Sequence, residues 1–399
     1  MSRSGGCWPW LKKPELHGMT AIPIIYLPVL MITHIAAFYL LARVPRLQAA
    51  RYGNVCRYPE RKTYMTSFGS AFSNAVVRMR STPSADVWFA GGEHIGYDPK
   101  ARLTVQAEDA PLEVFLRREG NVAHAVSFLP GFPDGSFGWA KVLSHLPNAS
   151  RMPKLFFDYV GMGDSDKPKD YAYSTAERTD LVEAIWRELS VKSTTLVAFD
   201  FSSLVVLEHL CRRLERAERG ESVGGPDIRG VFIFNGGLFT DGHSHPWYTT
   251  PILRRLPTRA RKRLGRSFTM FKMMMGVMWS KGYQVTDAEV RELQSTLARH
   301  DGSFYTAAGA GFVADHKAQG DRLDFSSLFK AYRDQFPFLV GGSNEDPFEH
   351  RQVDLAEERL GELGLQIERL PGGHLTTNEQ PEALAALIAK FERGLSTMA

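Results

Sequence analysis

The sequence TTLVAFDFSSL at residues 194–204 decides the fold predicted for this chain. Residues 194–199 form a short apolar run, which is typical of a strand buried on both faces of a sheet, and a helical pattern follows it. Asp200 lies where the strand becomes the helix, with the small residues Ala198 and Ser202 two positions away on either side. Small neighbours permit the strained turn of a nucleophile elbow, which lifts one side chain above the sheet.

The side chain at this turn is a carboxylate, and this determines the chemistry to be expected. Aspartate tolerates positive φ better than most residues do. A carboxylate nucleophile attacks carbon and forms an ester, so it suits alkyl substrates rather than acyl ones. Two alternatives stay open. Asp200 caps the following helix, or Ser202 or Ser203 is the nucleophile of a serine esterase, although neither serine has the elbow spacing.

Further apolar runs on both sides of this stretch predict more buried strands. They lie at residues 112–116, 123–129, 154–158, 230–234, 336–340 and 365–370. Helical patterns alternate with them, and this alternation predicts an α/β fold with a mostly parallel sheet covered by helices on both faces. The alternation stops between residues 235 and 327, where the sequence is helix-like and rich in Met, Arg and aromatic residues. We predict that this segment is a helical lid inserted after a sheet strand.

Polar residues follow several of the predicted strands. Ligands of parallel α/β sheets bind beyond the carboxyl ends of the strands, so these residues are the site candidates. A Pro-Gly-Phe-Pro turn offers the backbone N–H of Phe132 as an oxyanion donor. An Asn-Glu-Asp-Pro motif offers Asp346 as the acid, with Glu345 as the alternative, and a Pro-Gly-Gly-His motif ends at His374. Nucleophile, acid and histidine thus follow one another in the chain order of the hydrolases.

Five motifs together resemble the epoxide hydrolase and haloalkane dehalogenase branch of the α/β-hydrolases. They are PGFPDGSFGW, DYVGMGDSDKP, VAFDFSSLVV, NEDP and GGHLTTNEQPE. Two other stretches, FNGGLFTDGHSHP and ARHDGSFY, are similar to the mesoderm-specific transcript protein group within that branch. The resemblance covers roughly residues 102–394 and implies the α/β-hydrolase fold.

The resemblance implies a two-step hydrolysis that needs neither a metal nor an organic cofactor. Asp200 would attack an electrophilic carbon, while the backbone N–H groups of Phe132 and Phe201 hold the oxyanion. His374, oriented by Asp346, would then activate the water that cleaves the ester. The expected substrate is a small apolar molecule, such as an epoxide or a lipid-like ester.

Several positions depart from the family pattern. Phe201 has no side-chain donor where dehalogenases hold a halide, so dehalogenation is disfavoured. Pro130 replaces the usual histidine and Ser202 the usual glycine, which leaves a second hypothesis open, a catalytically inactive interaction or regulatory protein. Epoxide opening also needs tyrosine donors from the lid. The available ones are Tyr248, Tyr283, Tyr305 and Tyr332.

The N-terminal part of the chain contains an uncharged segment. Residues 18–42 are long enough to span a bilayer as one helix, and the basic residues that follow predict a hydrolase domain on the cytosolic side. We therefore expect a single-pass membrane protein, with the endoplasmic reticulum as a candidate membrane. The predicted organisation is a tail (1–17), an anchor (18–42), a connector (43–101), a core in two parts (102–234 and 328–399) and the lid (235–327).

Composition excludes other classes of protein. The net charge of +4 over 399 residues is small and its basic residues are scattered, so nucleic-acid binding is not expected. The three cysteines lie far apart in sequence, which predicts neither a disulfide framework nor a metal site built on cysteine.

Overall fold

The computed structural model describes residues 84–99, 111–148, 151–245 and 256–398. All of these lie in one compact unit, Val76–Ala399. The predicted tail, the predicted anchor at 18–42 and most of the predicted connector fall outside the described residues. None of the helices that are described is both long and apolar enough to cross a membrane.

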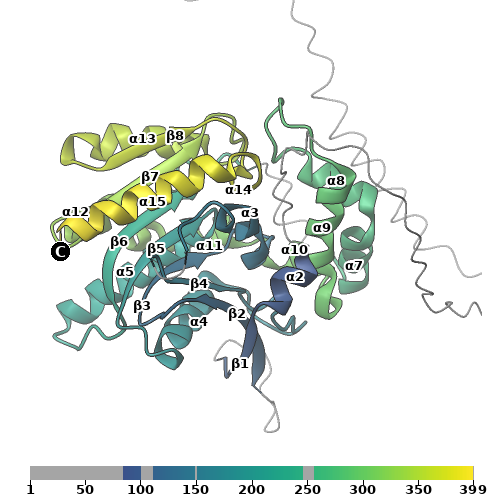
Figure 1. The fold of residues 1–399 in the computed structure, drawn as a ribbon, viewed down its shortest axis with the longest axis horizontal. Coiled ribbons are helices and arrows are strands. Elements are labelled where there is room, and N and C mark those ends of the chain that lie inside the picture. Colours follow the sequence, from purple (N-terminus) through teal and green to yellow (C-terminus); the bar gives the residue numbers. More distant parts are fainter. Residues whose placement is uncertain (1–83, 100–110, 149–150, 246–255, 399) are drawn as a thin grey trace, which may run out of the picture. The chain divides into compact units, whose positions relative to one another are not determined.

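A single sheet of eight strands forms the centre of the unit, in the order β1-β2-β4-β3-β5-β6-β7-β8 (Figure 1). The strands are β1 (Glu93–Tyr97), β2 (Leu112–Glu119), β3 (His124–Leu129), β4 (Lys154–Phe157), β5 (Ser193–Phe199), β6 (Asp227–Phe234), β7 (Phe338–Ser343) and β8 (Gln366–Leu370). β2 pairs antiparallel with both β1 and β4, and every other pairing is parallel. The predicted α/β sheet is confirmed.

Helices cover both faces of this sheet. Along β5, Leu196 and Ala198 belong to one buried cluster, and Val197 and Phe199 belong to the other, as the period of two in a strand requires. The first cluster packs under α4 (Thr175–Glu188), α5 (Ser202–Glu218), α12 (Phe325–Tyr332) and α13 (His350–Leu360). The second packs under α2 (Ala85–Ala90), α3 (Ala140–Leu143) and α15 (Pro381–Met398).

The sheet begins earlier than the sequence predicted. α2 and β1 lie inside the segment 43–101, which was predicted to be a connector, and because β1 belongs to the sheet the predicted start of the core at residue 102 is corrected. β1 is an edge strand whose residues Glu93, His94 and Gly96 are exposed. An edge strand of this kind shows no apolar run, and its sequence therefore gives little sign of it.

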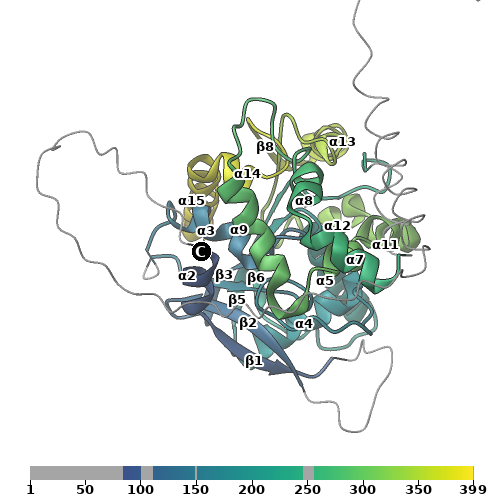
Figure 2. The same cartoon turned by 90° about the vertical axis from the view of Figure 1, so that its right-hand side faces the viewer.

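A helical insertion separates β6 from β7 (Figure 2). It contains α7 (Thr258–Arg266), α8 (Phe268–Met275), α9 (Asp287–Ala298), α10 (Tyr305–Gly309) and α11 (Phe312–Gln319). Phe271 and Met275 of α8 join the second buried cluster, so part of the Met- and Phe-rich sequence serves packing. The predicted lid boundary at residue 327 falls inside α12, and α12 packs on α5 together with the helices of the sheet.

Candidate active site

Asp200 occupies the turn between β5 and α5. Its φ is +55° and its side chain is buried, so the carboxylate is held at the carboxyl end of the central strand. The backbone N–H of Phe132 donates a hydrogen bond to Asp200 Oδ2 at 2.8 Å. This close approach requires glycine at position 131, because a Cβ there would lie 3.3 Å from the Asp200 Cβ and 2.5 Å from the Phe199 ring. The Phe132–Pro133 peptide bond is cis.

The structure brings His374 and Asp346 to the same place. The loops after β7 and β8 carry them, and His374 Nδ1 lies 2.8 Å from Asp346 Oδ2. On its other side, His374 Nε2 lies 3.4 Å from Asp200 Oδ1. All three side chains are at least 96% buried. Glu345, the alternative acid, is exposed, and its Oε2 instead accepts a hydrogen bond from the Lys281 N–H at 3.3 Å.

Asp346 is itself fixed by the backbone that follows it. Its Oδ1 accepts hydrogen bonds from the N–H groups of Phe348 at 2.8 Å and Glu349 at 3.2 Å. These bonds leave Oδ2 free to face the imidazole. The ring of His374 in turn packs against Phe199 on β5 and, in a T-shaped pair, against Phe348, with ring centres 5.8 and 5.2 Å away. The acid and the histidine thus have fixed orientations before any substrate binds.

The charge on His374 follows from this geometry. Burial opposes the imidazolium, but Asp346 and then Asp200 outweigh it and raise the pKa of His374 well above its usual value. Asp134, which follows Pro133, is buried in the same region. Burial, reinforced by the negative charge of Asp200, raises the pKa of Asp134 to about 7, although His374 acts in the opposite direction. The site therefore places one histidine among three acidic groups.

The two predicted oxyanion donors differ in the structure. The Phe132 N–H bonds directly to the carboxylate, as described above. Phe201 is the N-cap residue of α5, so its N–H belongs to the first, unpaired turn of that helix. Among the described residues, Phe201 N–H forms no hydrogen bond with Asp200 in this state. Its ring belongs to an aromatic group and contacts the rings of Phe132, Tyr159 and Phe312.

The predicted lid tyrosines occupy different positions. Tyr305 of α10 is buried against the ring of Phe132, at 5.7 Å between ring centres, and its hydroxyl accepts a hydrogen bond from Arg178 at 2.9 Å. The Tyr283 hydroxyl donates to Glu289 at 2.7 Å in a half-buried position. The Tyr332 hydroxyl bonds to the backbone of Leu210, under the sheet helices. Tyr248 lies outside the described residues. Tyr305 is therefore the described tyrosine that contacts the Phe132 turn.

Asn235 is a positioning residue that sequence reasoning missed. It directly follows β6 and has a φ of +49°. Its Nδ2 donates to the backbone carbonyl of His374 at 2.8 Å and to Thr376 Oγ1 at 2.9 Å. Its Oδ1 accepts from the Ser343 N–H at 2.7 Å. Asn235 thus ties the end of β7 to the histidine loop. The Asn-Gly-Gly sequence at 235–237, directly after a strand, was the available signal.

The insertion also contacts the histidine loop. The Leu375 N–H donates to the Met278 carbonyl at 3.2 Å, and the Ser280 N–H donates to Glu379 Oε1 at 2.9 Å. Gly373 lies so close to residues 278–280 that a Cβ there would approach the Ser280 nitrogen to 2.4 Å. The loop between α8 and α9 therefore packs directly on the backbone that carries the imidazole.

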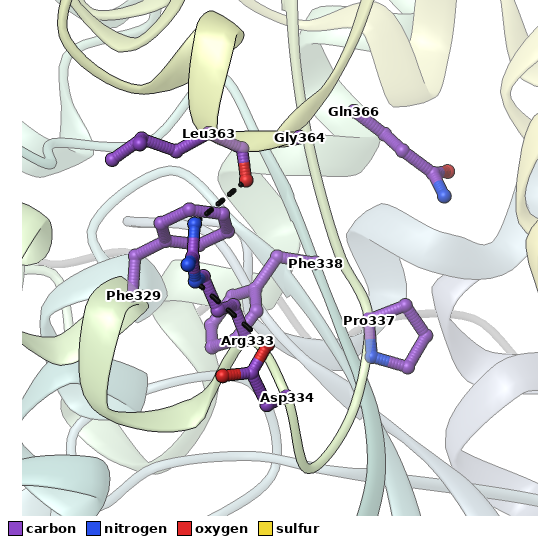
Figure 3. Close-up of a pocket in the computed structure, with 8 residues that line it drawn as sticks. All are labelled: Phe329, Arg333, Asp334, Pro337, Phe338, Leu363, Gly364 and Gln366. Atoms are coloured by element: carbon purple, nitrogen blue, oxygen red, sulfur yellow. Dashed lines mark hydrogen bonds and ion pairs between the residues drawn. The ribbon is translucent and has the colours of Figure 1, made fainter.

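A surface hollow of about 340 Å³ lies at the opposite end of the sheet (Figure 3). Phe338 at the start of β7 and Gln366 at the start of β8 line it, together with Arg333 and Asp334. Asp346 and His374 follow the other ends of these strands. The hollow is consequently separate from the cluster of Asp200, Asp346 and His374.

Comparison with known proteins agrees with this architecture. The chain is 32% identical over 189 residues to the mesoderm-specific transcript homolog protein of Bos taurus, covering 45% of this chain and 52% of that protein. It is 32% identical over 116 residues to the cis-3-alkyl-4-alkyloxetan-2-one decarboxylase of Shewanella oneidensis, covering 26% and 36%. The chain spans about half the length, or less, of these curated relatives.

Solved structures show the same fold. The epoxide hydrolase CorEH superposes with a TM-score of 0.52 at 16% identity, covering 76% of this chain and 99% of that one. A sequence model described as "Alpha/beta hydrolase family" matches residues 128–387, which include the Phe132 turn, Asp200, Asp346 and His374. The chain belongs to the alpha/beta hydrolase family.

Proposed function

We propose that this protein is a hydrolase in which Asp200 is the nucleophile and a covalent ester the intermediate, as in an epoxide hydrolase. One observation carries the proposal. The Asp200 carboxylate lies at the strand-to-helix turn between the Phe132 N–H, 2.8 Å from Oδ2, and His374 Nε2, 3.4 Å from Oδ1. A carboxylate between a fixed donor and a histidine base has the partners that both steps of this hydrolysis need.

In the first step, Oδ1 of Asp200 attacks a carbon of a strained oxygen ring. The carbon–oxygen bond of the ring breaks, and the released oxygen takes a proton from an acid on the insertion. Tyr305 is the described candidate for this acid, because its ring contacts Phe132. Arg178 donates to the Tyr305 oxygen, which leaves the tyrosine proton free to be given away.

In the second step, water attacks Cγ of the ester and His374 takes its proton. Negative charge then develops on Oδ2, the oxygen at which the Phe132 N–H already points. Collapse breaks the Cγ–Oδ1 bond, and Oδ1 leaves with the product as an alcohol after taking the proton held by His374. The oxygen of the water replaces Oδ1 in the Asp200 carboxylate, and the remaining proton restores the acid on the insertion. Ester formation also removes the charge of Asp200, which helps to raise the pKa of His374. The pKa of His374 therefore falls, and more of the imidazole is unprotonated and able to take a proton from water at the stage that needs a base.

The surroundings of Asp200 favour an apolar substrate. Phe132, Phe201, Phe312 and Tyr305 form a continuous aromatic group beside it, with neighbouring ring centres 5.7 to 6.3 Å apart. The related decarboxylase acts, by its name, on a four-membered oxygen ring that bears two alkyl groups. We therefore infer an alkyl-substituted strained oxygen ring as the substrate class. We further propose that residues 18–42 anchor the protein in a membrane, from which such a lipid-like substrate would be taken.

The serine esterase alternative has less support from the contacts of Ser202. Its Oγ donates to the Pro130 carbonyl at 2.5 Å and lies 3.0 Å from the Tyr159 hydroxyl, so it is engaged away from His374. A Ser202→Ala variant provides the matched control in the experiment below.

The test is mass spectrometry of a trapped intermediate. A His374→Gln variant incubated with alkyl epoxides and with an alkyl β-lactone should accumulate a covalent adduct on the peptide that contains Asp200. The adduct should form in His374→Gln/Ser202→Ala and be absent from His374→Gln/Asp200→Asn. An adduct that instead requires Ser202 would establish the esterase. Wild type that turns over none of the substrates, and no adduct in any variant, would favour the non-catalytic alternative.

A further inference from the structure

The loop after β6 brings two histidines to a buried glutamate on the loop that carries Asp346. His243 Nδ1 lies 2.9 Å from Glu349 Oε1, and His245 Nε2 lies 2.8 Å from the same oxygen. The three potential ligand atoms lie within 4.8 Å of one another. The side chains of His243 and Glu349 are 1% and 2% exposed, whereas that of His245 is 14% exposed. The cluster is thus closed on the protein side and reaches solvent through His245.

The composition of this cluster suits a transition metal ion. In the described part of the chain, Glu349 forms ion pairs with His243 and His245 and with no lysine or arginine. A buried carboxylate is costly unless a positive charge or hydrogen bonds compensate it. Two imidazoles and one carboxylate are a ligand set of Zn²⁺ and its first-row neighbours, whereas Mg²⁺ and Ca²⁺ prefer oxygen ligands.

A second layer of side chains holds the three groups in place. His243 Nε2 lies 2.8 Å from His316 Nδ1, on the side of the ring away from Glu349. Gln352 Nε2 donates to Glu349 Oε2 at 3.0 Å, and Gln352 is itself held by the N–H and the carbonyl of Phe239 at 2.8 and 3.0 Å. Metal-binding histidines and carboxylates are typically oriented by such outer contacts.

We propose that His243, His245 and Glu349 bind one divalent transition metal ion, with Zn²⁺ as the expected ion and a fourth position open to water. The ion takes the lone pairs of His243 Nδ1 and His245 Nε2. His243 then carries its proton on Nε2, where it donates to His316. Ligand atoms in a tetrahedral zinc site are roughly 3.3 Å apart, so the 2.8 and 2.9 Å contacts open by about half an ångström when the ion enters.

The position of the site suggests a structural effect on the catalytic group. The Glu349 N–H donates to Asp346 Oδ1. The Phe348 ring stacks on His245 at 5.0 Å and forms a T-shaped pair with His374 at 5.2 Å. A bound ion would therefore fasten the loop after β6 to the loop that carries the acid. This inference does not depend on the reaction proposed for Asp200.

The experiment uses the untagged full-length protein, stripped of metal with a chelator and titrated with Zn²⁺ and with Co²⁺. We expect one ion per chain by elemental mass spectrometry and a visible Co²⁺ spectrum of tetrahedral type. His245→Asn and Glu349→Gln should each weaken Zn²⁺ binding at least 100-fold. His350→Ala, an exposed histidine next to Glu349, and His374→Gln should bind as wild type does.

Two results would overturn the proposal. One is stripped wild type that takes up no stoichiometric Zn²⁺, which would leave a hydrogen-bonded cluster only. The other is binding in His245→Asn and Glu349→Gln within threefold of wild type, which would place the ion elsewhere. If Glu349→Gln does not fold, His245→Asn carries the test, because its side chain is partly exposed. A Zn²⁺-dependent rise in Tm in wild type but not in His245→Asn is the second readout.

Discussion

The side-chain amide of Asn235 donates a hydrogen bond to the backbone carbonyl of His374, at 2.8 Å, across 139 residues of sequence. Asn235 directly follows β6, the strand next to β7, so the sheet itself fixes the position of the histidine loop. The orientation of the imidazole thus depends on a residue that touches neither the nucleophile nor the acid. This relationship leads to the first prediction.

Asn235→Asp keeps the acceptor for the Ser343 N–H but removes the donors to His374 and Thr376. We expect it to lower kcat at least tenfold and to destabilise the fold by about 1–3 kcal/mol, the cost of leaving buried groups unpaired. Asn235→Gly retains the positive φ and should be similarly impaired. Rates and denaturant unfolding measured together check this, and a Gly variant with wild-type activity would contradict it.

The acid partner of His374 can be tested with a matched pair of neighbours. Asp346 contacts the imidazole at 2.8 Å, whereas Glu345 is exposed. We expect Asp346→Asn to reduce kcat by about 10²–10⁴-fold, because the amide no longer orients and stabilises the imidazolium. Glu345→Gln should change kcat less than threefold. Steady-state kinetics on the same substrate decide between them, and the reverse ranking would make Glu345 the acid.

The pKa of His374 should respond to both carboxylates. Asp346 and Asp200 raise it against the effect of burial. Asp200→Asn should therefore lower the pKa of His374, and Asp346→Asn should lower it further. Imidazole titration by NMR measures this, with Ser202→Ala as the unchanged control. A pKa of His374 that is the same in Asp200→Asn as in wild type would show that the two groups do not interact.

Asp134 gives a prediction about stability and pH. Its pKa is about 7 in the folded protein, above the usual value for a carboxyl, so ionising it in the buried site costs free energy. The contribution of Asp134 to stability is full below pH 4 and is lost as the pH rises towards 7, because the unfolded chain loses this proton first. At about 1.4 kcal/mol per pKa unit, the rise from 3.8 to about 7 corresponds to about 4 kcal/mol, and Asp134→Asn should remove up to that much of the loss. Denaturant unfolding between pH 4 and 8 checks it.

The control for Asp134 is Asp334→Asn, a change at a carboxyl whose side chain is 89% exposed. Its stability should follow that of wild type across the same pH range. A parallel pH profile in Asp134→Asn and wild type would mean that Asp134 ionises normally in the folded protein.

The sheet and the proximity of three side chains could be predicted from the sequence because each depends on a local pattern, an apolar strand followed by a polar residue. Asp200, Asp346 and His374 each follow an apolar run, and the carboxyl ends of parallel strands share one edge. Asp134 and Asn235 also lie near strand ends. They were not singled out because their roles depend on contacts with residues distant in sequence, which the local pattern does not reveal. The strand β1 was missed because its exposure hides its pattern. The choice between Asp346 and Glu345 likewise required the turn after β7, which spacing alone does not define.

The hydrogen bonds and close backbone packing between the α8–α9 loop and residues 373–379 have a consequence for protein engineering. Exchanging the insertion between relatives is an obvious route to a new substrate preference. Here a graft of residues 256–319 alone would put foreign backbone against Gly373 and remove the Ser280 contact with Glu379. A working chimaera therefore has to transplant the segment that bears His374 together with the helices above it.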